Sequence, residues 1–201
     1  MDITVLGEGV ALATPDMLRL HAGVEVRRAS AAESFAAVRA AAARLAEALR
    51  QVGIEAQDVS TAELSLGPEY EAYPKVSAYR AVQGFDVLVR DVGRADHVID
   101  TVAGVGEEAR LNGVNFEVSD PGSALREART TAFRDAAAKA AQYAELAGRP
   151  LGRVVSVSEE LRNGPPVPLG RSALMAAEAQ DTISPGRQSL TVVVKVGYDF
   201  A

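Results

Sequence analysis

Apolar and polar residues alternate along much of the chain, and this pattern predicts β-strands with one buried face. After Pro15-Asp16 the apolar set occupies every second position, while Arg19, His21, Glu25 and Arg27 fall between. A sheet with one buried face and one solvent-exposed face is typically antiparallel. The apolar residues of this strand are Leu18, Leu20, Ala22, Val24 and Val26. Other expected strands cover residues 3–5, 61–66, 77–82, 85–89, 114–118, 154–157 and 190–198.

Glycine and proline mark the expected breaks between these strands. Gly7-Glu8-Gly9 predicts a bend after the first strand, and Gly67-Pro68 predicts the end of the strand at 61–66. Residues 69–75 then read as an irregular excursion. The segments at 77–82 and 85–89 form either one bent strand or a hairpin about Gln83-Gly84.

Two long helices and one short helix are predicted from spacing and caps. Ser30 and Glu33 form a capping-box pattern before an apolar stripe that ends at Gly53. Asp91 can cap a short helix that contains Val98 and Val102. Asp120-Pro121 predicts the start of the second long helix, which Gly148 and Pro150 end. The apolar face of that helix is largely alanine, which permits close approach to a sheet or to another helix: Leu125, Ala128, Ala132, Ala136, Ala140, Tyr143 and Ala147.

These elements predict an α+β fold, in which two long helices and one short helix pack on an antiparallel sheet. Regular β-α alternation, as in doubly wound parallel sheets, is missing. The 201 residues fit a single domain spanning 1–201, which could divide into two subdomains. Residues 163–185 are expected to form an irregular, protruding loop, because they contain four prolines.

Composition narrows the classes of partner. The formal net charge is −6, from 21 basic and 27 acidic residues, and this argues against a nucleic-acid partner. No apolar run approaches the roughly 20 residues of a membrane span. Because no signal peptide is visible, the expected location is cytoplasmic, or periplasmic or secreted if a signal peptide has been removed. The chain has no cysteine, so it has no disulfide and no thiolate site.

The sequence offers no set of residues for catalysis. His21 and His97 are the two histidines, and neither has a metal-ligand neighbour at a useful spacing. The G-x-S-x-G motif of a nucleophile elbow is also missing. Gly7-Glu8-Gly9 and Gly104-Val105-Gly106 do not extend to a phosphate-binding motif, and a bend and a helix stop explain them better. We therefore predict no enzyme activity, no catalytic residue, no cofactor and no metal.

Apolar and aromatic residues on the expected irregular segments are the candidate contact residues. Tyr70 and Tyr73, with Tyr79 nearby, could stack on a ligand, enter a subunit contact or pack over a sheet edge. The loop at 163–185 carries apolar side chains that a solvated linker would avoid, so it lies either on a neighbouring subunit or on its own domain. These loop residues are Val167, Leu169, Leu174 and Met175.

Short motifs in a fixed order along the chain resemble the SIMPL-domain family, the group that includes bacterial periplasmic immunogenic proteins. The motifs are Ile3-Thr4-Val5-Leu6-Gly7-Glu8-Gly9, Pro15-Asp16, Gly23-Val24, Gly53-Ile54, Asp58-Val59-Ser60-Thr61, Pro68-Glu69-Tyr70, Tyr79, Phe116-Glu117-Val118-Ser119-Asp120, Asp135-Ala136 with Lys139-Ala140, Gly148, Leu151-Gly152, Val155-Ser156-Val157-Ser158-Glu159 and Ile183-Ser184-Pro185-Gly186. The resemblance covers essentially the whole chain. It implies an α+β fold, a tendency to form homo-oligomers that are ring- or channel-like in some members, and no established enzyme activity.

The functional expectation is therefore a non-enzymatic protein that assembles with itself into a ring-, cage- or channel-like homo-oligomer. Its physiological role does not follow from the sequence. The alternative is a binding module for a small ligand or peptide, with a stress-related role, that uses the region of Tyr70, Tyr73 and Tyr79.

Overall fold

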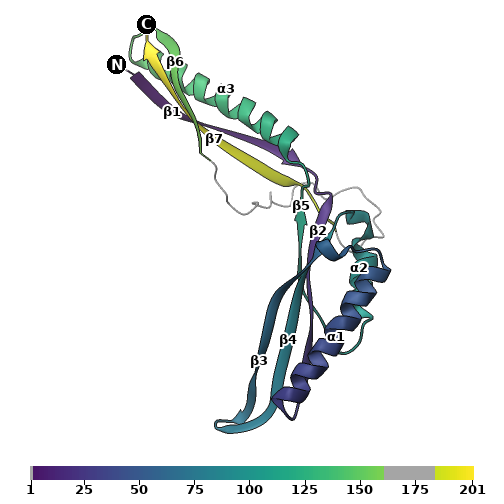
Figure 1. Ribbon diagram of the computed structural model, residues 1–201. Coiled ribbons are helices and arrows are strands. Elements are labelled where there is room, and N and C mark those ends of the chain that lie inside the picture. The colour runs from purple at the N-terminus through teal and green to yellow at the C-terminus, as the bar shows by residue number, and fades with distance from the viewer. Residues whose placement is uncertain (1, 161–183) are drawn as a thin grey trace. The chain divides into compact units, whose positions relative to one another are not determined.

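The computed structural model describes residues 2–160 and 184–201, and these residues form two compact units (Figure 1). One unit, here the three-stranded unit, contains residues 2–14, 118–160 and 186–201. The other, the four-stranded unit, contains residues 15–117 together with 184–185. The second unit is thus inserted in the sequence between the first strand and the remaining elements of the first unit.

The three-stranded unit is an antiparallel sheet with one long helix on one face (Figure 1). Its strand order is β1-β7-β6, so the last strand of the sequence lies in the middle. The strands are β1 (Asp2–Ala13), β6 (Leu151–Glu160) and β7 (Gln188–Phe200). The helix α3 (Gly122–Leu146) packs mainly on β1 and β7.

Gly7 and Gly9 lie inside β1, so the bend predicted at Gly7-Glu8-Gly9 is wrong. Both glycines pair with β7 and face α3. A Cβ atom on Gly7 would overlap the backbone oxygen of Ala132, and one on Gly9 would overlap that of Ala128. The glycines are therefore required by the close approach of a helix and not by a turn.

The alanine stripe of α3 is the other half of this contact. Every fourth residue from Ala124 to Ala144 is an alanine and is buried. The expected close approach to a sheet is confirmed. The helix begins two residues after Asp120, whose Oδ1 accepts a hydrogen bond from the backbone N–H of Gly122, and it ends before Gly148 at φ +65°.

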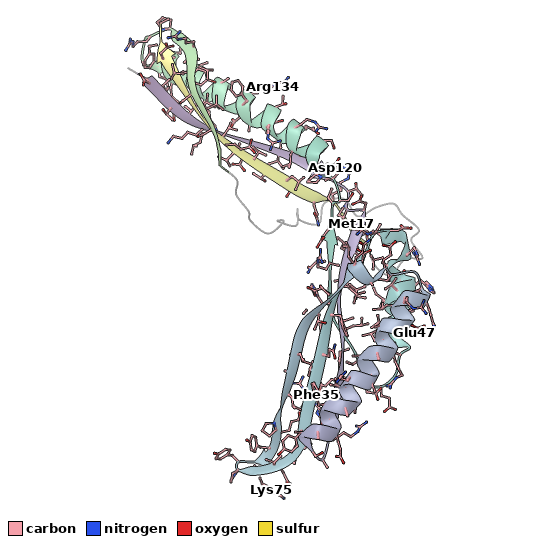
Figure 2. All side chains as sticks on the ribbon, in the orientation of Figure 1. Met17, Phe35, Glu47, Lys75, Asp120 and Arg134 are labelled. Carbon is pink, nitrogen blue, oxygen red and sulfur yellow. The ribbon has the colours of Figure 1, made fainter. Side chains whose placement is uncertain are left out.

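The four-stranded unit is an antiparallel sheet of order β3-β4-β2-β5 with two helices on one face. Its strands are β2 (Met17–Arg28), β3 (Val59–Ala72), β4 (Lys75–Val89) and β5 (Ala109–Glu117). The helices are α1 (Ala31–Gln51) and α2 (Ala95–Ala103). A short 3₁₀ turn, η1 (Ala56–Asp58), follows α1, and another, η2 (Val92–Arg94), precedes α2. The β3–β4 hairpin turns next to Lys75. This turn lies at one end of the sheet, and Met17, the first residue of β2, lies at the other end (Figure 2).

The core of this unit lies between the sheet and its helices, where the alternation of β2 meets the stripe of α1. Ser30 caps α1 by accepting a hydrogen bond from the backbone N–H of Glu33, as the capping pattern predicts. The buried hydroxyl of Ser34 donates to the Tyr79 carbonyl and accepts from the Arg28 N–H, which fixes the start of α1 on the sheet. Fully buried apolar side chains, each contributing roughly 1.5–3 kcal/mol, include Leu18, Leu20, Val24, Val38, Leu45, Leu49, Val87 and Val98.

β3 continues through Gly67-Pro68, so the predicted break and the irregular excursion at 69–75 are wrong. The strand reaches Ala72, and β4 begins at Lys75. Pro68 is tolerated because β3 lies at the edge of the sheet, where one side of the backbone needs no partner. The segments at 77–82 and 85–89 belong to one continuous strand, β4, in which Gly84 pairs with Gly23.

The predicted α+β class is confirmed, because the described residues form two long helices and one short helix on antiparallel strands. The strands in this part of the chain form two sheets, whereas the sequence pattern led us to expect one. The expectation of one domain that could divide into two subdomains stays a prediction, and the loop predicted at 163–185 lies almost entirely outside the described residues.

Candidate functional site

Tyr70 and Tyr73 lie together at the end of the β3–β4 hairpin. Their ring centroids are 5.5 Å apart, and the rings are tilted by 53°. Tyr73 is 85% exposed and Tyr70 is 48% exposed, and the nearby Val76 is also exposed. Tyr79 is separate from this pair, because it lies farther along β4, where it pairs with Pro68 and is half-buried. The end of the hairpin therefore presents two aromatic rings to solvent.

The other four candidate contact residues belong to the loop predicted at 163–185. Val167, Leu169, Leu174 and Met175 lie outside the described residues. Their role in a subunit contact stays a prediction.

The open face of the four-stranded sheet, opposite α1 and α2, carries a network of ion pairs centred on Glu25. Its side chain is 10% exposed, and its carboxylate lies 2.8 Å from the guanidinium groups of both Arg80 and Arg27 and 3.8 Å from Arg110. The hydrogen bond from Arg80 is the main cause that lowers the pKa of Glu25, and the charges of all three arginines act in the same direction. Glu25 is therefore held ionised, which suits a structural role better than proton transfer.

His21 joins a row of polar side chains across three strands of the same face. Its Nδ1 lies 2.6 Å from Oδ1 of Asp86, and its Nε2 lies 2.9 Å from Nδ2 of Asn115. The sequence placed His21 on the polar face correctly, but it could not show these partners. No hydroxyl or amine that could act as a nucleophile bonds to this row among the described residues. His97 is exposed on α2 and is not part of the row.

Two side chains of α3 occupy the free edge of β1. Asp135 accepts a hydrogen bond of 2.8 Å from the Glu8 N–H, and Lys139 donates one of 3.1 Å to the Leu6 carbonyl. The two side chains also form an ion pair of 2.6 Å with each other. The hydrogen bond from Lys139, followed by that from Glu8, lowers the pKa of Asp135. These contacts satisfy backbone groups that a bare strand edge would offer to another chain.

A groove of about 440 Å³ lies between α3 and β6. Its apolar lining comes from Phe133, Val157 and Val194, and its polar lining includes Arg129, Glu159 and Arg134. Arg129 and Glu159 form a bidentate pair with distances of 2.7 and 3.0 Å. Sequence reasoning missed this groove. No local pattern marks it, because its lining comes from elements that are distant in the sequence.

The described residues show no group of three or more His, Asp or Glu side chains arranged to hold a metal ion. Within the same residues, no helix is long and apolar enough to cross a membrane.

Comparison of the whole chain with known proteins identifies a matching family and several relatives. The family model of SIMPL, described as a protein of unknown function (DUF541), matches residues 3–198. The chain is 32% identical to the 26 kDa periplasmic immunogenic protein of Brucella melitensis biotype 1, over 98% of this chain and 84% of that protein. The protein of the same name in Brucella abortus gives the same identity and coverage. The uncharacterized protein YggE of Edwardsiella ictaluri is 32% identical over 85% of this chain and 72% of its own length.

Proposed function

Because the chain belongs to the SIMPL family, a family of unknown function, we propose its role from its surfaces: it is a non-enzymatic protein that assembles into a homo-oligomer. The observation that carries this proposal is the exposed pair Tyr70 and Tyr73 at the end of the β3–β4 hairpin. Tyrosines that protrude on a hairpin bury large areas at a low entropic cost when they enter a protein contact. A second copy of the chain is the partner that is always present at matching concentration.

The strand edges support the same proposal. The edge of β1 is occupied by Asp135 and Lys139, whereas β3 and β6 are outer strands that carry exposed apolar side chains. Leu64 and Leu66 are exposed on β3, and Val155 is exposed on β6. Contact between two different surfaces of neighbouring copies generates a closed ring when the rotation between them closes. The proposed assembly is ring-, cage- or channel-like, and such contacts would supply its interfaces.

Light scattering coupled to size exclusion tests the assembly. We expect a mass several times the 21.1 kDa of one chain at micromolar concentration. The double substitution Tyr70→Ser with Tyr73→Ser should lower that mass, and Tyr143→Ser is the matched control because Tyr143 is an exposed tyrosine on α3. A wild-type mass of one chain would refute the proposal. A double variant that keeps the full mass would remove the hairpin end as the contact.

The loop residues need a separate experiment. Deletion of 164–182 removes Val167, Leu169, Leu174 and Met175 while it leaves β6 and β7 intact. Fewer chains per particle, with an unchanged circular dichroism spectrum, would assign these residues to the subunit contact. An unchanged number of chains per particle would exclude them.

We also infer a periplasmic location rather than the cytoplasmic one expected at first. Its support is the name of the Brucella relatives, which describes them as periplasmic, and the 32% identity with them over 98% of this chain. A chain without cysteine is compatible with that oxidising compartment. Fractionation of the native host cells, with the protein detected in the osmotic-shock fluid, tests this inference, and recovery only with the cytoplasmic marker contradicts it.

A further inference from the structure

The α3–β6 groove exists because α3 lies close to one side of the three-stranded sheet. Gly7 and Gly9 allow the backbone of α3 to approach β1, and the alanine stripe continues this contact onto β7. The helix makes few contacts with β6, the third strand. As a result, Val157 stays 56% exposed and Phe133 stays 39% exposed, although both border the buried Val194. A volume of about 440 Å³ falls within the range of small-molecule sites, roughly 300–1,000 Å³.

Of residues 2–160 and 184–201, two arginines but only one carboxylate line this groove, so one positive charge is left over. The carboxylate of Glu159 neutralises Arg129 through two hydrogen bonds, which also raise the pKa of Arg129 and lower that of Glu159. Arg134, which also lines the groove and is labelled on α3 in Figure 2, has no hydrogen bond or ion pair with any residue in the described part of the chain. A chain of net charge −6 thus leaves this guanidinium, among the residues described, unpaired beside an apolar surface.

We propose that the α3–β6 groove binds a single-chain amphiphile with a carboxylate head, such as a medium-chain fatty acid. The alkyl chain lies on Phe133, Val157 and Val194, where it removes exposed apolar surface from water. The carboxylate accepts two parallel hydrogen bonds from Arg134, because the planar guanidinium matches that geometry. A neutral amphiphile would leave Arg134 unpaired, and a short carboxylate would leave the apolar lining bare.

Calorimetric titration of the full chain with dodecanoate, below its micelle concentration, tests the proposal. We expect one site per chain and an affinity that falls about tenfold or more in the Arg134→Gln variant, since a charge-assisted bidentate contact is lost. Arg126→Gln is the matched control, because Arg126 is exposed on the same helix but does not line the groove. Dodecanol and hexanoate should each bind at least tenfold more weakly than dodecanoate.

Two further readings locate the ligand. Amide chemical shifts should change at residues 129–134 and 157–159 and leave the four-stranded unit unchanged, and Phe133→Ala should weaken binding without altering the circular dichroism spectrum. Absence of binding at millimolar dodecanoate would overturn the proposal. Equal affinity of the wild type and the Arg134→Gln variant, or shift changes centred away from the groove, would overturn it as well.

Discussion

Glu25 is a carboxylate on the open face of a sheet, yet three guanidinium groups cover most of its surface. Arg80 and Arg27 each approach within 2.8 Å, and Arg110 lies 3.8 Å away. These arginines come from β4, β2 and β5, so one carboxylate joins three adjacent strands. A single ion pair at a protein surface contributes little, but a network in which the shared carboxylate is nearly buried contributes more. The ion pairs of Glu25 therefore help to hold three adjacent strands together.

Glu25→Gln should lower the free energy of unfolding at pH 7 by about 2 kcal/mol, the usual value for hydrogen bonds to a charged group. The pKa of Glu25 is lower in the folded protein than its ordinary value of 4.5, so its contribution is complete above that pH. It is lost as the pH falls through the folded pKa. Urea unfolding at pH 7 and pH 3 should show a gap between wild type and variant that narrows at pH 3.

Glu107→Gln is the control for this experiment. Glu107 is exposed, and no ion pair of its side chain occurs among the described residues. Its substitution should change stability by less than about 0.5 kcal/mol at either pH. The same pH dependence in both variants would contradict the assignment to Glu25.

At the scale of elements, the contact between β1 and α3 depends on glycines and alanines, whose missing or small side chains let the two backbones come close. Two glycines on the strand face a helix stripe of alanines, and the backbones approach more closely than any larger residue would allow. The same pair of elements is joined at its margin by Asp135 and Lys139, which bind the backbone of Glu8 and Leu6. The two motifs, far apart in the sequence, are thus two sides of one contact.

Gly7→Ala tests this contact. Its methyl group would overlap the Ala132 oxygen, so the helix must move and the free energy of unfolding should fall by about 1–3 kcal/mol or more. Gly67→Ala is the matched control on strand β3, because nothing lies within 4 Å of the position that its methyl group would take. Chemical unfolding followed by circular dichroism measures both variants. Equal stability of the two would show that α3 does not depend on the glycine.

The elements that sequence reasoning placed well are those specified by neighbouring residues. Ser30 caps α1 and the alanine stripe of α3 packs on a sheet, because caps and helical periodicity are local properties. The breaks at Gly7-Glu8-Gly9 and Gly67-Pro68 were wrong, because the same residues serve a strand when a distant helix or an edge position requires them. The α3–β6 groove depends on the lateral position of a helix, which no local pattern encodes. Tyr70 and Tyr73, which were expected on an irregular loop, lie exposed at the end of a hairpin, and their role in a contact stays a prediction.

For the whole molecule, the main feature is that residues 15–117 form an insertion whose ends meet. The Asp16 N–H donates to the Glu117 carbonyl over 3.1 Å, and Met17 pairs with Glu117 in the sheet. Both ends of the inserted segment therefore leave from adjacent strands, β2 and β5. Among residues 2–160 and 184–201, its core cluster uses residues from within 15–117 alone. Such a segment has the properties of a domain that can fold without its host.

We expect a fragment of residues 15–117 to fold when it is expressed alone. Heating should give a single cooperative transition, and amide spectra should show dispersed resonances that overlay those of the same residues in the full chain. The counterpart, in which a short glycine-serine linker replaces 15–117, should retain the β1-β7-β6 sheet. An unfolded 15–117 fragment would mean that its core needs residues from outside the insertion.

The central position of β7 sets the order in which the chain can fold during synthesis. Val5 pairs with Val196, so β1 must wait for about 190 further residues, roughly 10–40 s at typical rates of translation. The four-stranded unit needs only residues up to 117 for its sheet and can form while β1 still has no partner. A ribosome that stops after residue 160 but before residue 188 would therefore release a chain whose four-stranded unit is complete, while β1 and β6 both lack β7, the strand that pairs with each of them.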